Sequence, residues 1–151
     1  MRKQPISLDE SMEQPGFYSP KHVSKPWGHE VIFGHYKAGS GAEGYLGKLL
    51  HVQKGHSLSL QYHGSKTETL MLLYGKVRVT LGKDEDSLER RVLDVHTVLH
   101  VARGYLHRLE ALENSCIVEV STPYPNDTVR LEDLYGRTSS VPKKPPKRAK
   151  K

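Results

Sequence analysis

The sequence predicts an all-β protein that forms one sandwich or barrel. From Lys25 to Pro123, short runs rich in β-branched, aromatic and leucine residues are separated by glycine or charged turns, and helical periodicity is scarce. Short strands at this even spacing are typical of sandwiches and barrels. The length of 151 residues suits a single domain. The expected strands cover residues 30–36, 45–52, 57–63, 69–75, 76–82, 90–95, 97–102, 106–112 and 116–122.

Alternation assigns the two faces of these strands. In residues 76–82 apolar side chains alternate with polar ones, which is the pattern of an ordinary half-buried strand. In residues 57–63, Gln61 and His63 share one face, because successive side chains of a strand point in opposite directions. Beyond the last strand, a short helical turn is expected to start at Asp127 and to stop near Gly136.

The two ends of the chain differ from the domain at residues 25–137. Residues 1–24 are expected to form an arm, flexible or covering a sheet edge, because prolines interrupt them. Residues 138–151 are expected to be a disordered basic tail, because proline and lysine at this density cannot build a core. Without the six cations of this tail, 17 Lys and Arg balance 17 Asp and Glu. The domain is therefore neutral, and a nucleic-acid partner is not expected.

The composition also bears on the cellular setting. The single cysteine, Cys116, excludes an internal disulfide, which suits a reducing compartment. The first residues mix charges and prolines and contain no apolar segment that could act as a signal peptide or a membrane anchor. We therefore expect a cytoplasmic chain with no membrane partner.

Four polar residues form a candidate metal site. Gln61 and His63 lie on one face of a strand, Glu68 follows a short turn, and His107 lies in a later strand. Two imidazoles, a carboxylate and an amide oxygen suit one divalent ion such as zinc, manganese, iron, cobalt or nickel. Histidine and glutamate are common in turns, so this spacing is only moderately specific by itself.

Two stretches of the chain resemble the cupin family. The first cupin motif is matched by Gly55, Gln61, His63, Glu68 and Gly75, and the second resembles ARGYLH at 102–107, with alanine where the family has proline. More narrowly, the chain is similar to the C-terminal cupin domain of type II mannose-6-phosphate isomerases, in which glutamine is expected at the first ligand position. The matching words are KPWGHE (25–30), SLSLQYH (57–63), HRLE (107–110), EVST (119–122) and VRLEDLYGR (129–137).

This resemblance implies a jelly-roll barrel (a double-stranded β-helix) that holds one divalent metal ion, and frequent homodimers. It also implies a site for a sugar or a sugar phosphate. Matched to the family, the catalytic candidates are Glu119, Lys48 and Arg130, and Arg108 is a candidate for substrate binding. Lys66, on the turn beside Glu68, is a second candidate for substrate binding, because its charge could attract a phosphate; the alternative is that it is simply solvated. The chain departs from the isomerases at Gly64, Ser65 and Thr69, where the family usually has histidines.

Together these implications predict a metal-dependent aldose–ketose isomerase related to mannose-6-phosphate isomerase. The ion would act as a Lewis acid on the substrate oxygens while Glu119 or Lys48 moves a proton between neighbouring carbons, and Arg130 with Lys66 would hold anionic groups. Two alternatives stay open. Many cupins with a similar ligand shell are metal-dependent oxygenases, and the replaced histidines also suit a carbohydrate-binding cupin that does not turn over its ligand.

Overall fold

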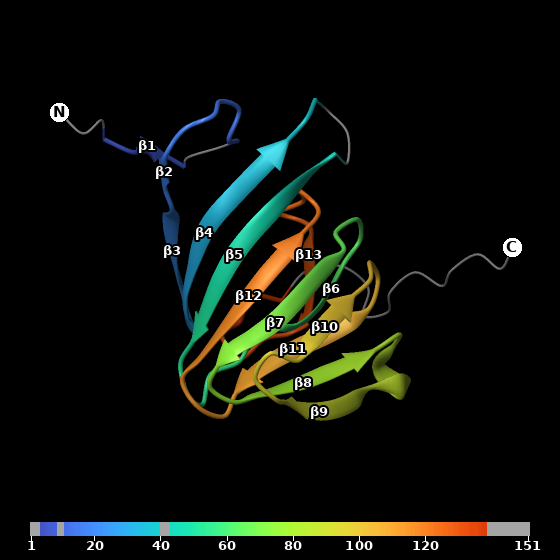
Figure 1. Ribbon diagram of the computed structural model, residues 1–151. Helices are drawn as coiled ribbons and strands as arrows, with labels where there is room; N and C mark the ends of the chain where they lie inside the picture. Colours follow the sequence, from blue (N-terminus) through green and yellow to red (C-terminus); the bar gives the residue numbers. More distant parts are fainter. Residues whose placement is uncertain (1–3, 9–10, 40–42, 139–151) are drawn as a thin grey trace, which may run out of the picture.

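The chain folds almost entirely as β-strands (Figure 1). The computed structural model describes residues 4–8, 11–39 and 43–138. Within these ranges there is no α-helix, only a short 3-10 turn at Glu85–Ser87, and hence nothing that could cross a membrane as a helix. The strands are β1 (Ile6–Ser7), β2 (Tyr18–Ser19), β3 (Lys21–Lys25), β4 (Gly28–Lys37), β5 (Gly44–Val52), β6 (Leu60–His63), β7 (Glu68–Tyr74), β8 (Val77–Gly82), β9 (Glu89–Leu93), β10 (Val98–Val101), β11 (Leu106–Ala111), β12 (Ser115–Ser121) and β13 (Thr128–Glu132). The predicted all-β class is confirmed.

Two large sheets face each other. One has the strand order β10-β7-β12-β5-β4-β3 and the other β13-β6-β11-β8-β9, and every pair within them is antiparallel. From β5 onward the chain crosses between the sheets at almost every connection, as jelly-roll barrels do. Segments far apart in the sequence therefore become neighbours: Gln61 in β6 pairs with both His107 and Arg130, and Glu119 in β12 pairs with Lys48.

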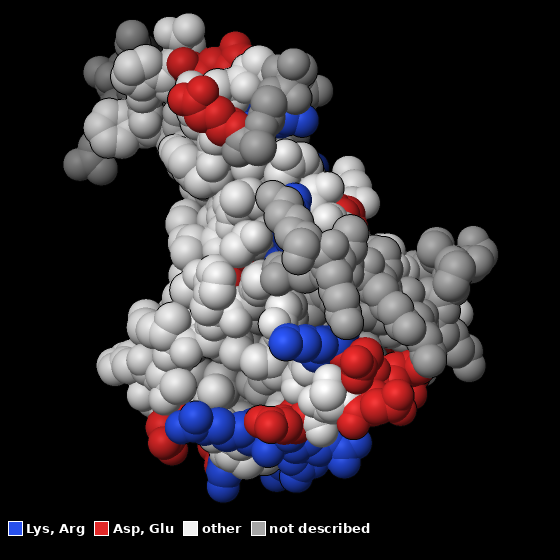
Figure 2. Space-filling view, turned by 90° about the vertical axis from the view of Figure 1, so that its right-hand side faces the viewer, with Lys and Arg blue, Asp and Glu red and all other residues white. Residues whose placement is uncertain are grey.

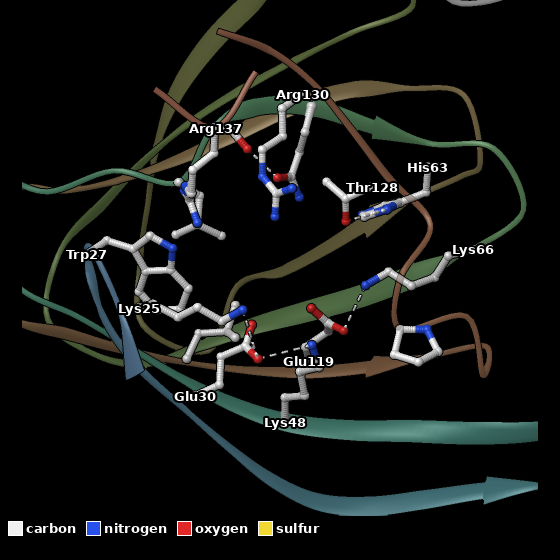
Figure 3. Close-up of a pocket in the computed structure, with 15 residues that line it drawn as sticks. Lys25, Trp27, Glu30, Lys48, His63, Lys66, Glu119, Thr128, Arg130 and Arg137 are labelled. Atoms are coloured by element: carbon white, nitrogen blue, oxygen red, sulfur yellow. Dashed lines mark hydrogen bonds and ion pairs between the residues drawn. The ribbon is translucent and has the colours of Figure 1, made fainter. Parts of the chain in front are cut away.

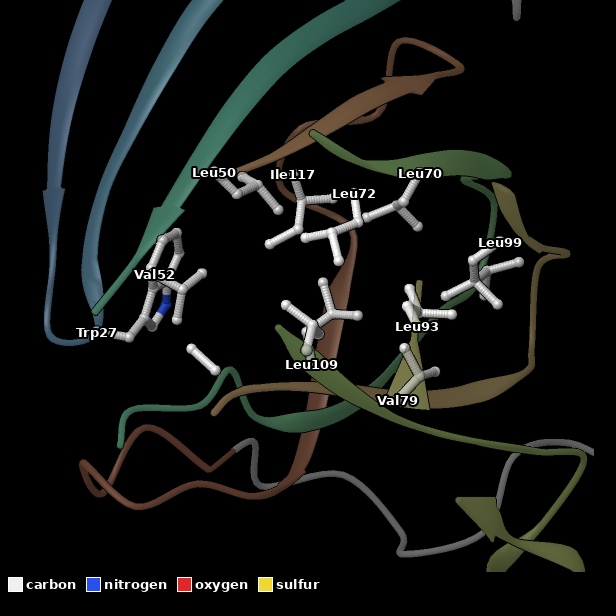
Figure 4. Packing of buried hydrophobic residues seen from close by; sticks show 13 residues of the cluster. Trp27, Leu50, Val52, Leu70, Leu72, Val79, Leu93, Leu99, Leu109 and Ile117 are labelled. Carbon is white, nitrogen blue, oxygen red and sulfur yellow. The ribbon is translucent and has the colours of Figure 1, made fainter. Parts of the chain in front are cut away.

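The hydrophobic core lies between the two sheets (Figure 4). Because the side-chain period of a strand is two, alternate residues such as Leu70 and Leu72 point inward together. The buried cluster consists of Trp27, Leu50, Val52, Leu70, Leu72, Val77, Val79, Leu93, Leu99, Val101, Leu109, Ala111 and Ile117. Trp27 and Leu50 also line the pocket described below, so one end of the core forms part of the pocket wall.

Two segments differ from the expectations drawn from the sequence. Residues 128–132 form strand β13, so the helical turn expected after Asp127 is wrong. The backbone of this strand pairs with β6, and its alternate residues Val129 and Leu131 pack in a small apolar cluster with Leu60, Tyr62 and Leu106. Within the expected arm at 1–24, residues from Lys21 already belong to the edge strand β3. The expected tail falls almost wholly in residues 139–151, which lie outside the described ranges.

Candidate metal centre and adjoining pocket

Three of the four expected metal ligands converge inside the barrel. His63 ends β6, Glu68 begins β7, and His107 lies near the start of β11. One potential ligand atom from each of these residues lies within 4.8 Å of the other two. Each residue is at most 3% exposed. A buried carboxylate between two imidazoles is a donor set that suits a borderline divalent ion.

The hydrogen bonds around this cluster orient its imidazoles. Nδ1 of His107 lies 3.1 Å from the carbonyl oxygen of Tyr105, and Nδ1 of His63 lies 3.5 Å from the hydroxyl of Thr128. A carbonyl only accepts hydrogen bonds, so Nδ1 of His107 is the protonated nitrogen and Nε2 carries the lone pair. That Nε2 is 2.8 Å from Glu68 Oε1, and Nε2 of His63 is 3.6 Å from Glu68 Oε2. Neither Nε2 makes a well-aligned hydrogen bond, although both are buried. The two nitrogens and the carboxylate therefore fit a shared cation.

Charges in the cluster favour the metal-binding protonation states. Burial lowers the pKa of His63, which outweighs the opposite effect of Glu68, so the neutral imidazole is favoured. Burial alone would raise the pKa of Glu68, but His107, His63 and the Lys66 ammonium hold it well below its usual value. A neutral imidazole and an ionised carboxylate are the forms that coordinate metals.

Gln61 lies beside this cluster on the same strand as His63. It is half-buried and lines the same pocket. Its side-chain oxygen accepts a hydrogen bond of 2.6 Å from the Ser59 hydroxyl, so that oxygen is held by the protein. As a fourth ligand, Gln61 remains a proposal.

Lys66 connects the cluster to the adjoining pocket. Its ammonium lies 2.9 Å from Glu68 Oε2 and 3.1 Å from Glu119 Oε2, and the same Glu119 oxygen accepts a hydrogen bond from Ser121. Burial would lower the pKa of Lys66, but Glu119 and Glu68 raise it. The side chain is only 5% exposed, so Lys66 is an internal bridge between two carboxylates. Glu119 points into the barrel.

A second group of charges lines the same pocket, with Lys48 beside Glu119 (Figure 3). Glu30 Oε2 is 3.3 Å from Lys48 Nζ and 3.8 Å from Lys25 Nζ. Burial lowers the pKa of Lys25, Glu30 opposes this, and Lys48, Arg130 and Arg137 lower it further. The cations thus crowd one another.

The pocket that these groups line is predominantly cationic. Its empty space, counted out to the open mouth, is about 520 Å³. The lining contains five Lys and Arg residues against two glutamates. In Figure 3, Arg130 and Arg137 lie on the opposite side of the pocket from Lys48 and Glu119. The lining residues are Lys25, Trp27, Glu30, Lys48, Leu50, Leu58, Ser59, Gln61, His63, Lys66, Glu119, Pro125, Thr128, Arg130 and Arg137. Anions are the ligands that such a lining favours.

Asp127 fixes the turn that carries Lys66. Its carboxylate accepts hydrogen bonds from the backbone N–H groups of Gly64, Ser65 and Lys66, at 3.1, 2.8 and 2.6 Å. Gly64 and Ser65, two of the three positions at which the chain departs from the isomerases, are therefore part of a tight turn bound by a carboxylate. Sequence reasoning placed Asp127 at a helix start, and only the contact between distant segments shows its role.

Of the residues expected in the site, Arg108 lies apart from the rest. It alternates with His107 on β11, so it points to the opposite face, where its guanidinium pairs with Glu132 at 3.0 Å. Conversely, sequence reasoning did not single out Lys25, Glu30 and Arg137. All three lie in the words KPWGHE and VRLEDLYGR, so the resemblance contained a signal for them.

Comparison with known proteins identifies the family. The family model described as "Mannose-6-phosphate isomerase C-terminal" matches residues 16–133. The chain belongs to this family. The match covers the pocket-lining residues up to Arg130, and only Arg137 lies beyond it.

Two curated relatives are each 30% identical to the chain. They are mannose-1-phosphate guanylyltransferase ManC of Salmonella typhimurium, matched over 122 residues, and xanthan biosynthesis protein XanB of Xanthomonas campestris, matched over 123. Each match covers 78% of this chain. The chain spans only about a quarter of the length of these relatives, 23% and 24% respectively.

Solved structures support the cupin barrel at low sequence identity. The capsular polysaccharide assembling protein CapF of Staphylococcus aureus matches with a TM-score of 0.60 and 17% identity, over 77% of this chain and 35% of that one. KdgF from Halomonas sp. matches with a TM-score of 0.57 and 16% identity, over 72% and 89%. An oxalate decarboxylase matches with a TM-score of 0.60 and 18% identity, over 80% and 32%. At these identities the likeness shows the fold alone.

Proposed function

We propose that the protein is a metal-dependent aldose–ketose isomerase of a sugar phosphate, related to mannose-6-phosphate isomerase. The observation that carries the proposal is the position of the cluster of His63, Glu68 and His107 at a pocket lined by five cations. Family membership supports it, since the family model takes its description from mannose-6-phosphate isomerase. A divalent ion held by the two imidazoles and the carboxylate, with Gln61 as a fourth ligand, would supply Lewis acidity.

Other residues of the pocket would bind the phosphate and the sugar carbons of the substrate. Arg130, with Lys25 beside it, would bind the phosphate, because a guanidinium fork matches its oxygens and an anion would relieve the crowding of these cations. Arg137 would add charge rather than a free fork, because its Nε and Nη2 already donate to Asp133 at 2.9 Å. Trp27 lies in the pocket wall and would pack against the sugar carbons. The substrate would then span the distance from the arginines to the histidine cluster.

Glu119 is the proposed base that moves a proton between neighbouring carbons. Lys66 and Ser121 both contact its Oε2, which leaves Oε1 to take the proton. Lys48 is the alternative base, but its ammonium is 3.3 Å from Glu30 and would first have to lose a proton. We therefore place Glu119 first and give Lys66 the role of holding its carboxylate in position.

Conversion of mannose 6-phosphate to fructose 6-phosphate by the metal-loaded protein tests this function. The expected result is turnover that disappears in Glu119→Gln while phosphate-sugar binding is retained. Absence of turnover with this and related aldose phosphates would remove the isomerase proposal.

A second candidate is a carbohydrate-binding protein without turnover. One observation favours it: both candidate bases are held in ion pairs, Glu119 with Lys66 and Lys48 with Glu30. This candidate predicts that a sugar phosphate raises the unfolding temperature and that no product forms.

Oxygen consumption by the ferrous protein in the presence of a substrate would instead indicate the oxygenase that the sequence left open.

A further inference from the structure

The turn that follows β13 closes on itself through one carboxylate. In residues 133–137, the N–H of Gly136 donates to the carbonyl oxygen of Asp133 at 3.4 Å, and the Asp133 carboxylate accepts from the backbone N–H of Arg137 at 2.8 Å. Gly136 has a φ of 74°, in the left-handed region that favours glycine. The Asp133 side chain is fully buried and also binds the Arg137 guanidinium. The turn is therefore a compact unit that holds one arginine.

This arginine reaches the pocket. Arg137 is part of the pocket lining, and Figure 3 places it on the same side as Arg130. Burial lowers the pKa of Lys25 and of Arg130, and the charge of Arg137 lowers both further. The position of Arg137 therefore affects how strongly the pocket attracts an anion.

Tyr135 connects the far end of the turn to the barrel. Within the described residues, the backbone of the turn makes no hydrogen bond to another strand. The ring of Tyr135 packs against the hydrophobic core, and its hydroxyl lies 2.7 Å from Nδ1 of His56. The two rings are nearly parallel, at 8°, with their centres 6.0 Å apart. The Arg137 guanidinium lies over the same tyrosine ring, 5.5 Å from its centre.

His56 is a fixed partner for this tyrosine. Its backbone N–H donates to the carbonyl oxygen of Gln53 at 3.0 Å, and its own carbonyl accepts from the N–H of Ala111 at 2.9 Å. Neither His56 nor Tyr135 is among the residues that line the pocket. The contact between their side chains can therefore influence a ligand only through the turn.

We propose that His56 and Tyr135 form a latch that positions Arg137 at the pocket and thereby sets the affinity of the pocket for anions. When the latch opens, the arginine is in place for a smaller fraction of the time, and the apparent affinity falls by that fraction. The inference rests on the anion site of the proposed function, but it does not depend on turnover.

Binding of inorganic phosphate, measured by calorimetry, tests the latch. Tyr135→Phe removes only the hydroxyl, and it should raise the dissociation constant for phosphate about threefold to tenfold, the factor that one hydrogen bond typically supplies. Arg137→Met should raise the same constant about fivefold or more. Adding Tyr135→Phe to Arg137→Met should then change it less than about twofold, because the latch has no arginine left to position.

The surface seen in Figure 2 does not compete for this probe. Its Lys and Arg residues at the lower end lie beside Asp and Glu residues, and the exposed segment 83–91 likewise mixes the two signs. This surface therefore offers phosphate no patch of one sign.

A matched control and a second variant keep the test decisive. Tyr74→Phe removes a hydroxyl that lies 3.4 Å from Nδ1 of His51, a residue outside the pocket lining, and it should leave phosphate binding unchanged. His56→Ala should weaken binding as Tyr135→Phe does, and it replaces that variant if circular dichroism shows that Tyr135→Phe is unfolded.

The possible results separate the latch from the proposed reaction. A protein that binds phosphate but isomerises no sugar phosphate would remove the isomerase proposal alone. The latch would be overturned by a wild type that binds no phosphate, by wild-type affinity in Tyr135→Phe or His56→Ala, or by the same loss of affinity in Tyr74→Phe. It would also be overturned if Tyr135→Phe weakened binding as much in Arg137→Met as in the wild type.

Discussion

Removing the Lys66 ammonium tests whether the buried charges act as one network. In Lys66→Met, Glu68 and Glu119 lose the cation that lies 2.9 and 3.1 Å from them, and both carboxylates remain buried. Breaking a buried ion pair in this way typically costs about 3–5 kcal/mol, because an uncompensated charge stays inside. We expect a loss of that size in the free energy of unfolding, measured by urea titration of the metal-free protein.

Two comparisons make this measurement specific. Arg78→Met breaks the pair with Glu110, whose side chains are 42% and 40% exposed, and it should cost no more than about 1 kcal/mol. Adding Glu119→Gln to Lys66→Met should recover part of the loss, because one unpaired carboxylate is then removed. A loss below about 1 kcal/mol for Lys66→Met would contradict the bridging role of this lysine.

Three other changes give further tests. Without metal, the lowered pKa of His63 should reduce the free energy of unfolding as the pH falls below about 6.5, because the unfolded chain then binds the proton more readily than the folded chain. Urea titrations at pH 7.5 and 5.5 should show a smaller drop in this free energy for His63→Gln than for the wild type. An equal drop in both proteins would count against burial of His63 as the cause. Asp127→Ala removes the acceptor for three backbone N–H groups and should cost about 2 kcal/mol in the same assay; an unchanged stability would mean that the turn holds itself. Arg130→Met should raise the KM for mannose 6-phosphate about tenfold or more. Arg108→Met loses only the pair with Glu132, and its KM should stay within about twofold of the wild-type value. A larger effect in Arg108→Met than in Arg130→Met would place the phosphate site on the other face of the sheet.

Much of the fold could be predicted from the sequence, because short runs rich in β-branched, aromatic and leucine residues are separated by glycine or charged turns. The nine runs expected from Glu30 to Thr122 all contain strands of the structure. In the run at residues 57–63 only the second half is a regular strand, because β6 begins at Leu60 and Ser57 makes an isolated bridge to Glu110. Strand β13 was missed because Asp127 is a good helix start by itself, and its long-range contact with the turn at residues 64–66 cannot be read from local sequence.

The pocket shows the same division between local and long-range information. The resemblance to the cupin motifs was enough to name His63, Glu68 and His107, because each occupies a fixed place in those motifs. It could not show that Lys66 is internal, since a lysine in a polar turn is usually solvated. Nor could it show that Glu30 pairs with Lys48, because that contact depends on the register between β4 and β5.

Elemental analysis of the untagged protein tests the central claim most directly, since the account depends on a divalent ion held by His63, Glu68 and His107. We predict about one zinc, manganese, iron, cobalt or nickel ion per wild-type chain, with almost none in His107→Ala. Gln61→Ala should retain part of the metal, because three ligands remain. A wild-type protein that binds no such ion after incubation with each metal, or a His107→Ala variant that binds as much as the wild type, would contradict the account.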